Sequence, residues 1–157
     1  TTDNVTFNNS LFDAIDIDFS EGKIANTTIN KSGNDSLDFS YSTSELKNIK
    51  INDSGDKAIS AGEESKIEIE LIEISKSKFA FASKDNSYVN VRDAKIHNVD
   101  YLGAAYQKKP EFGPSSLNIE NFSYSNVRLD FARESNSEIL VNGILVKENV
   151  ELNYDTF

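Results

Sequence analysis

A spacing of four apolar residues recurs along the chain, and its fixed period restricts the possible folds more than any other feature. Each copy has two apolar residues one position apart, a gap of two positions, and two further apolar residues. The clearest copies are Ile67, Ile69, Ile72 and Ile74; Val89, Val91, Ala94 and Ile96; Leu117, Ile119, Phe122 and Tyr124; and Ile139, Val141, Ile144 and Val146. Equivalent residues lie 22 positions apart, except that 28 positions separate the second copy from the third, which indicates a six-residue insertion. Such a period is typical of a solenoid.

A third strand is predicted between successive copies of this block. Its members are residues 14–19, 36–41, 57–61, 79–82, 101–105, 128–131 and 151–154. Three short strands per repeat, joined at polar corners, predict an all-β fold, a single-stranded parallel β-helix of about six to seven coils of about 22 residues. An antiparallel sandwich is the alternative, but a sandwich has no physical reason to repeat at a fixed period.

One domain is expected over residues 1–157, with residues 1–12 as a partial coil or cap. Because the chain contains no Met, we interpret it as a piece of a longer protein. The expected partners at the ends of the coil stack are a neighbouring domain of the same polypeptide or a second copy, since an open solenoid end exposes apolar core and unpaired strand edges.

Inward side chains of a β-helix form columns, because each strand stacks on its equivalent in the next coil at about 4.8 Å. The first predicted column is Ile17, Phe39, Ile59, Phe81, Phe131 and Tyr154, and the second is Ile15, Leu37, Phe79, Tyr101, Leu129 and Leu152. Lys57 interrupts the second column and Gly103 leaves the first one empty. The register of residues 57–61 and 101–105 therefore stays open, because a shift by one residue would exchange the two faces.

Asparagine is frequent at the predicted corners. The corner asparagines are Asn26, Asn48, Asn98, Asn121 and Asn126. Asparagine tolerates the left-handed backbone conformation that tight corners require, so we expect a structural role for these residues.

Charge and composition exclude several classes of function. The chain has 16 Lys and Arg against 26 Asp and Glu, which gives a formal net charge of −10. Such a chain repels nucleic-acid phosphates, so no nucleic-acid partner is expected. No apolar stretch reaches the roughly 20 residues of a membrane span. The absence of Cys excludes disulfides and thiolate chemistry, and no cofactor is indicated.

Several segments resemble the right-handed parallel β-helix repeats of the pectate-lyase-like superfamily. The resemblance rests on residues 55–65 and 81–87, and with residues 105–113 it extends to the β-helical region of large bacterial surface proteins. It implies right-handed coiling, an extracellular or cell-envelope location and contact with polysaccharide. The calcium aspartates and catalytic arginine of pectate lyases, and the paired aspartates of polygalacturonases, have no match here. We therefore expect a non-catalytic structural or interaction module, with carbohydrate as a candidate ligand; the alternative is a polysaccharide lyase or glycoside hydrolase.

The turn after the first strand of each coil carries the candidate binding residues. They are Glu63, Lys84, Asp85, Tyr106, Lys108 and Lys109. One interpretation is a groove in which the lysines hold an acidic sugar beside the tyrosine, because loop insertions on a solenoid often lie on its binding face. The other is a set of opposite surface charges that offset one another, each pair worth at most about 1 kcal/mol.

Asp16 and Asp38 are the candidates for a metal site. They occupy the same outward column in adjacent coils, and carboxylate oxygens are the ligands that calcium prefers. An acidic surface also produces such pairs by chance, so no metal ligand is assigned and calcium remains a weak hypothesis.

Overall fold

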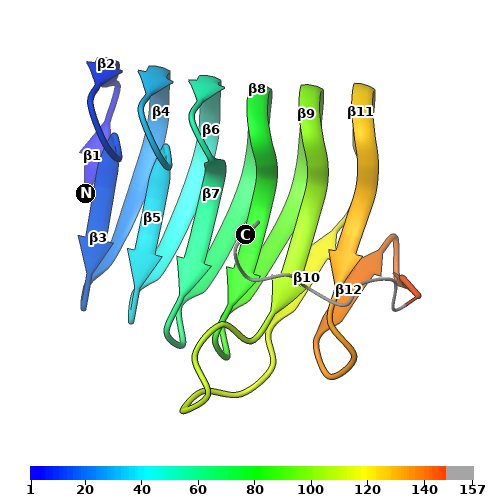
Figure 1. Ribbon diagram of the computed structural model, residues 1–157. Helices are drawn as coiled ribbons and strands as arrows, with labels where there is room; N and C mark the ends of the chain where they lie inside the picture. Colours follow the sequence, from blue (N-terminus) through cyan, green and yellow to red (C-terminus); the bar gives the residue numbers. More distant parts are fainter. Residues whose placement is uncertain (148–157) are drawn as a thin grey trace.

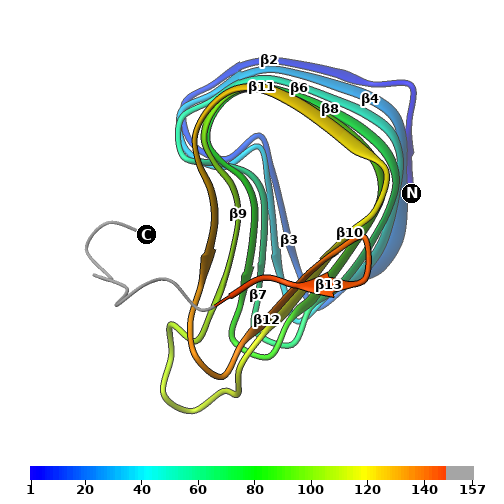
Figure 2. The ribbon, with the colours of Figure 1, turned by 90° about the vertical axis from the view of Figure 1, so that its right-hand side faces the viewer.

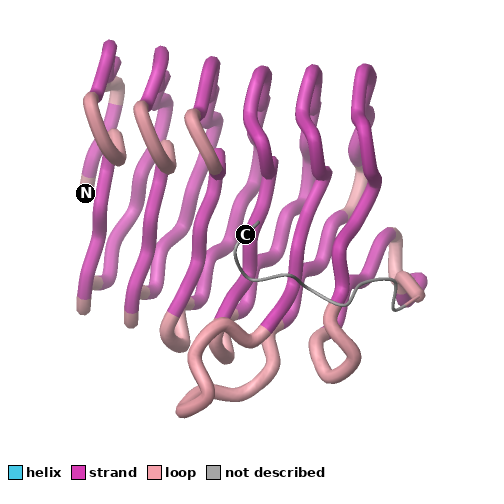
Figure 3. The backbone as a smooth tube through the Cα atoms, in the orientation of Figure 1, coloured by secondary structure: helices cyan, strands magenta, loops and turns pink. Residues whose placement is uncertain are grey.

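A computed structural model describes residues 1–147, and within this range the chain consists of strands and turns with no helix (Figure 3). The strands are β1 (Thr2–Asp3), β2 (Thr6–Ser10), β3 (Ile15–Asp18), β4 (Glu21–Ser32), β5 (Leu37–Ser40), β6 (Thr43–Ser54), β7 (Lys57–Gly62), β8 (Lys66–Lys84), β9 (Tyr88–Tyr106), β10 (Ser116–Ile119), β11 (Phe122–Arg133), β12 (Glu138–Val141) and β13 (Ile144–Leu145). The longest strands bend around the corners, so β8 and β9 each run along several sides of a coil (Figure 2).

The coils stack in parallel, and the prediction of a parallel β-helix is confirmed (Figure 1). The strand equivalents pair one coil after another, for example β4 with β6 and β6 with β8. One complete column along the stack consists of Ile15, Leu37, Ile59, Phe81, Gly103 and Phe131, which defines six coils. The first five members follow one another at exactly the predicted period, and the last lies beyond the insertion.

The register predicted from the four-residue blocks is confirmed for the first three copies. Ile67 pairs with Val89, which pairs with Leu117, and the inward side chains of these positions are fully buried. The fourth copy departs from the pattern, because Ile144 pairs antiparallel with Val141 in the β12–β13 hairpin. The turn at Asn142 and Gly143, both with positive φ, reverses the chain there. At the other end, β1 and β2 pair with β4 and form a partial first coil.

The predicted columns of the first strand were wrong by two residues from the third coil onward. Ile59 pairs with Leu37, whereas Phe39 pairs with Ala61. The prediction aligned large side chains with large side chains, and the structure keeps the 22-residue period even where a small residue then fills the column. The predicted members Leu152 and Tyr154 lie outside the described residues.

Phe79 and Tyr101 do not belong to the main core. Their rings stack on each other at 4.6 Å and pack in a second cluster with Ala104 and Tyr106. Ala80 and Phe81 are adjacent in the sequence, yet both belong to the main core. This arrangement indicates that the strand bends here. This bend explains why simple alternation failed to predict the faces in residues 57–61 and 101–105.

The corners have the left-handed backbone that their composition predicted. All five corner asparagines have positive φ, between 35° and 55°. Their side chains also join the coils: Asn48 Nδ2 donates to Asn26 Oδ1 at 2.8 Å, and Asn126 Nδ2 donates to Asn98 Oδ1 at 3.0 Å. Asparagine thus adopts the left-handed backbone conformation of the corner, and its side chain forms a hydrogen bond to the next coil.

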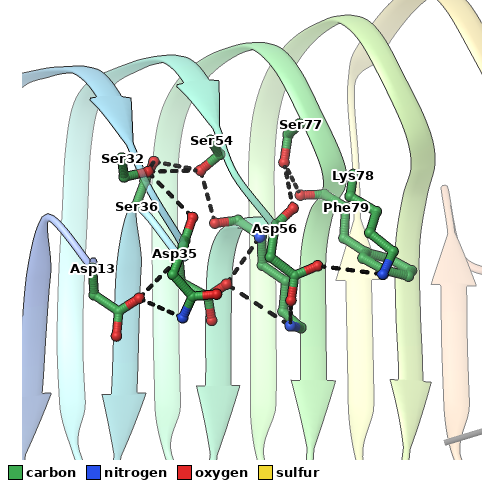
Figure 4. A network of polar contacts seen from close by, with 11 residues as sticks. Asp13, Ser32, Asp35, Ser36, Ser54, Asp56, Ser77, Lys78 and Phe79 are labelled. Carbon is green, nitrogen blue, oxygen red and sulfur yellow. Dashed lines mark hydrogen bonds and ion pairs between the residues drawn. The ribbon is translucent and has the colours of Figure 1, made fainter. Parts of the chain in front are cut away.

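A second polar stack fills the corner before the first strand of each coil (Figure 4). Asp13 Oδ1 accepts the backbone N–H of Asp35 at 2.8 Å, and Asp35 Oδ1 accepts the backbone N–H of Lys57 at 2.9 Å. Both Asp35 and Lys57 are buried, and Lys57 Nζ lies 3.8 Å from Asp35 Oδ1 and also pairs with Asp56. Although Lys57 opposes the effect, burial raises the pKa of Asp35. These contacts join successive coils through a buried polar corner.

Candidate functional site

The corner after the first strand has the same backbone conformation in four successive coils. Phe19, Tyr41, Glu63 and Asp85 follow β3, β5, β7 and β8, and each has φ between 49° and 55°. Their spacing is exactly 22 residues. This conformation suits Gly or Asn and disfavours bulky side chains. The repeat therefore fixes the backbone at this corner, while the residue type changes from coil to coil.

Asp85 anchors the inserted loop, residues 107–115, between β9 and β10. Its buried Oδ1 accepts the backbone N–H groups of Lys108 at 2.6 Å and Lys109 at 2.7 Å. Gln107 closes the loop from within, because its Nε2 donates to the carbonyl of Phe112 at 2.5 Å. The backbone N–H of Asn86 donates to the carbonyl of Gly113 at 2.9 Å. The insertion is therefore held in one conformation by a buried carboxylate.

The loop reaches back toward earlier coils, along the lower edge in Figure 1. The ammonium of Lys109 pairs with the carboxylate of Glu63, two coils away. Partial burial opposes the effect, but hydrogen bonds from Lys109 and Ser40 and the charge of Lys109 lower the pKa of Glu63. The hydrogen bond to Glu63 raises the pKa of Lys109. The two groups stay charged and paired across the neutral pH range.

Three aromatic rings lie at the same edge, and sequence reasoning missed them. The rings of Phe19 and Tyr41 are parallel with centroids 4.7 Å apart, and the ring of Phe112 meets Tyr41 edge-on at 5.9 Å. Phe19 is 76% exposed and Tyr41 is 43% exposed. We call these three residues the aromatic edge. The 22-residue separation of Phe19 and Tyr41, directly after equivalent strands, was the signal that would have found it.

The predicted site residues do not all gather at this edge. Glu63, Asp85, Lys108 and Lys109 lie together at the base of the loop. Tyr106, expected beside the lysines, is instead buried at the end of β9, and burial raises the pKa of its hydroxyl. The alternation along β9 turns this side chain into the second cluster rather than toward the loop.

Lys84 lies close to the residues at the base of the loop, because its charge acts on Glu63 and is itself influenced by Lys108. Its side chain crosses the neighbouring coil at Gly62, where a Cβ atom would stand 3.5 Å from Lys84 Cε. Burial lowers the pKa of Lys84, although the charge of Asp38 opposes the shift. Its ammonium lies within range of the charges of Asp38, Asp35 and Lys57 in the preceding coils.

One comparison with known proteins decides the family. Residues 1–150 match the family described as right-handed beta helix region. The chain belongs to the right-handed β-helix family. No curated protein and no solved structure matches it. The handedness implied by the sequence resemblance is thereby confirmed, together with the coil repeat.

A shallow groove on another side of the β-helix is the alternative site. Its walls carry opposite charges that pair across coils: Lys23 Nζ lies 2.5 Å from Glu45 and Lys47 Nζ lies 3.1 Å from Glu70. These exposed pairs neutralise one another, and Arg92 is the remaining basic side chain of the lining. The groove offers an ion-paired surface, and its lining contains no aromatic residue.

Asp16 and Asp38 lie directly opposite each other in β3 and β5, as the repeat predicted. Residues 1–147 contain no group of three or more His, Cys, Asp or Glu side chains arranged to hold a metal ion. Calcium binding at this pair stays a prediction. Within the same residues there is no helix long and apolar enough to cross a membrane.

Proposed function

We propose that this β-helix is a non-catalytic recognition module that binds an acidic carbohydrate chain at the aromatic edge. The observation that carries the proposal is the exposed stack of Phe19 and Tyr41 on left-handed corners. A left-handed conformation costs a residue other than Gly roughly 1–2 kcal/mol, and an exposed apolar ring recovers little of it by burial. Aromatic side chains at these two positions are therefore unfavourable for stability, which is the pattern expected where side chains serve recognition.

The geometry suits a sugar ring. Among the described residues, the stack of the two rings ends at Phe19, so the outer face of the Phe19 ring is open to solvent. The edge of the Tyr41 ring lies beside the Phe19 ring. The electron-rich face of an aromatic ring attracts the polarised C–H groups of a pyranose while the hydroxyl groups remain hydrated. Because the two rings are stacked face to face, the outer face of Phe19 would receive one sugar ring, and the edge of Tyr41 would lie beside the next sugar of the chain.

The charges near the loop support an acidic ligand. Lys108 is exposed and its ammonium has no ion-pair partner among residues 1–147, whereas Lys109 is held by Glu63. The net negative charge of the whole chain repels acidic sugars at long range. At physiological salt this repulsion is screened beyond about 8 Å, so it does not prevent an acidic ligand from approaching.

The same geometry favours binding over catalysis. A glycoside hydrolase needs two carboxyl groups that face the bound sugar and are free to exchange protons. At this edge Glu63 is engaged by Lys109, and Asp85 is buried beneath the loop backbone. Both carboxylates hold the loop in place. An extracellular or cell-envelope setting, which the family resemblance implies, is where such a ligand would be met.

Calorimetric titration with a hexamer of galacturonic acid tests the proposal. We expect binding that weakens at least tenfold in Phe19→Ala and in Tyr41→Ala. The matched control is Phe12→Ala, because Phe12 is 77% exposed but lies outside the aromatic edge. A neutral hexamer of glucose should bind more weakly than the acidic one. Equal binding by all three variants would refute the assignment, and shortening of the oligomer during incubation would refute the non-catalytic role.

A further inference from the structure

Asp35 and Lys57 occupy equivalent positions in adjacent coils, at the corner before the first strand. Asp35 precedes β5 and Lys57 begins β7, so both lie at the opposite end of the strand from the aromatic edge. The two residues are 22 positions apart and stack at about 4.8 Å along the coil axis. The side chain of Lys57 is 8% exposed and that of Asp35 is 5% exposed. An amine and a carboxyl group are therefore enclosed together, largely away from water.

The geometry holds these two groups close to each other. Lys57 Nζ lies 3.8 Å from Asp35 Oδ1. The same oxygen accepts the backbone N–H of Lys57 at 2.9 Å, so the carboxyl group is fixed beside the lysine (Figure 4). Groups that a fold orients in this way can react as if present at roughly 10⁵–10⁸ M. The contact is therefore suited to a reaction as well as to an ion pair.

Burial also favours the reactive forms of such groups. A charged group that leaves water loses its hydration, so a buried acid and a buried amine tend toward their neutral forms. Burial raises the pKa of Asp35, although the charge of Lys57 opposes the shift. Transfer of one proton from the ammonium to the carboxylate gives an amine beside a carboxylic acid. These are the two reactants of an amide bond.

A third side chain contacts the amine. The carboxylate of Asp56 pairs with the ammonium of Lys57, and Asp56 Oδ1 also lies 3.7 Å from Lys78 Nζ. Formation of an amide is assisted by a group that takes a proton from the attacking nitrogen and returns it to the departing oxygen. Because Asp56 already contacts the nitrogen, it is placed to carry this proton.

We propose that the side chains of Lys57 and Asp35 become joined by an isopeptide bond, which links the second and third coils covalently. The amine nitrogen forms a bond to Asp35 Cγ, and the bond from Cγ to one carboxyl oxygen breaks. Asp56 takes a proton from the nitrogen and gives it to the departing hydroxyl, which leaves as water. In total the ammonium loses two protons and the carboxylate loses one oxygen, so no other reactant is needed.

The product fits this corner. An amide is uncharged, so its formation removes the cost of keeping two ions away from water. The link closes the segment between residues 35 and 57 in a chain that has no Cys, and it restricts the unfolded chain as a disulfide would. Protein in which the bond has not formed keeps the ion pair, and this form is the reference for substitutions at the pair.

Intact mass spectrometry of the whole chain tests the proposal. We expect a mass lower than that of the sequence by one water molecule. Lys57→Arg should have the full mass of its sequence. The matched control is Lys84→Arg, because Lys84 is also partly buried against a neighbouring coil, and this variant should still lack one water. A thermal melt of each variant confirms that it is folded.

Two results of this measurement would overturn the proposal. The first is a parent protein with the full mass of its sequence. The second is a loss of water that persists in Lys57→Arg, because an aspartate can also lose water by closing onto its own backbone. Asp56→Asn should contain at least tenfold less cross-linked protein at the same time after purification. An equal amount would overturn the role of Asp56 in the proton transfer.

Digestion with trypsin locates the bond without relying on any variant. Trypsin cleaves after free lysines but not after a Lys57 whose amine is acylated. The cross-linked protein should therefore give one branched peptide made of residues 32–47 and 51–66. Protein with a free Lys57 gives residues 51–57 and 58–66 as separate peptides. Separate peptides alone, or a branch at a carboxyl group other than that of Asp35, would overturn the assignment.

Discussion

Gly55 stands where two interior coils approach each other closely, and its replacement by alanine tests the stacking directly. A Cβ atom at this position would lie 2.2 Å from the carbonyl oxygen of Gly33 and 2.6 Å from its carbonyl carbon. Ordinary contacts of a Cβ atom begin at about 3.4 Å, so the coils would have to separate by about 1 Å. The obstacle is backbone, which cannot rotate away as the end of a side chain can.

The expected loss follows from the bonds at this point. The N–H of Gly55 donates to Ser32 O at 3.0 Å, and the N–H of Asp56 donates to Asn34 O at 3.1 Å. Separation of the coils would weaken both bonds, at about 1 kcal/mol each. Overpacking adds about 1–3 kcal/mol. Gly55→Ala should therefore lower the free energy of unfolding by about 3–5 kcal/mol.

Urea unfolding of three alanine variants gives the measurement and its controls. At Gly22, nothing lies within 4 Å of the added Cβ, so Gly22→Ala should be neutral or stabilise by up to about 1 kcal/mol. At Gly33 the clash is as severe, 2.0 Å from Leu11 O, but the first coil can detach without disrupting the others. Gly33→Ala should therefore cost less than Gly55→Ala. A Gly55→Ala variant as stable as Gly22→Ala would refute this close approach of the coils.

Two further predictions concern ionised groups. Lys57→Met leaves the buried carboxylate of Asp35 without its cation, so it should lower the free energy of unfolding by about 3–5 kcal/mol in urea at pH 7. Adding Asp35→Asn should recover most of this loss. An equal loss in the double variant would contradict the pairing. Glu63→Gln removes a group whose pKa is lowered in the folded state, so its contribution of up to about 1 kcal/mol is present at pH 7 and is lost as the pH falls through that lowered pKa. The stability curves of the variant and the parent protein should therefore converge in acid, once Glu63 is protonated in the folded protein. A difference that persists there would contradict the role of the Lys109 pair.

The strict period predicted the stack well because it depends on geometry and not on residue type. Every coil must return to the same corner, so residues 22 apart align whether they are large or small. The error at Ile59, aligned with Phe39 instead of Leu37, arose from following side-chain size. The last repeat could not be predicted in the same way. A hairpin at Asn142 and Gly143 redirects Ile144, and an isolated Asn-Gly pair resembles the other Asn corners.

The candidate site was harder to predict than the fold. The insertion itself was visible as an extra six residues, and the pairing of Glu63 with Lys109 joins residues that were predicted to share one edge. The burial of Tyr106 was not visible, because its side chain enters a second cluster that is formed with Phe79 and Ala132 from the neighbouring coils. Asp85 was predicted either to bind a ligand or to offset a neighbouring surface charge, whereas in the structure it accepts two backbone N–H groups of the loop.

The corner after the first strand combines a fixed backbone with free choice of side chain, and this combination supports the recognition role that we propose for it. Inward columns require apolar residues, and Gly55 requires the absence of a side chain, so neither position can vary without loss of stability. At the corner, the backbone φ angles of Phe19, Tyr41, Glu63 and Asp85 are nearly identical, while their side chains have different roles. Two are exposed rings, one pairs with the loop and one anchors it. A loop of modest length adds little closure entropy, so a single insertion held by two carboxylates can extend this edge without disturbing the coils beneath it.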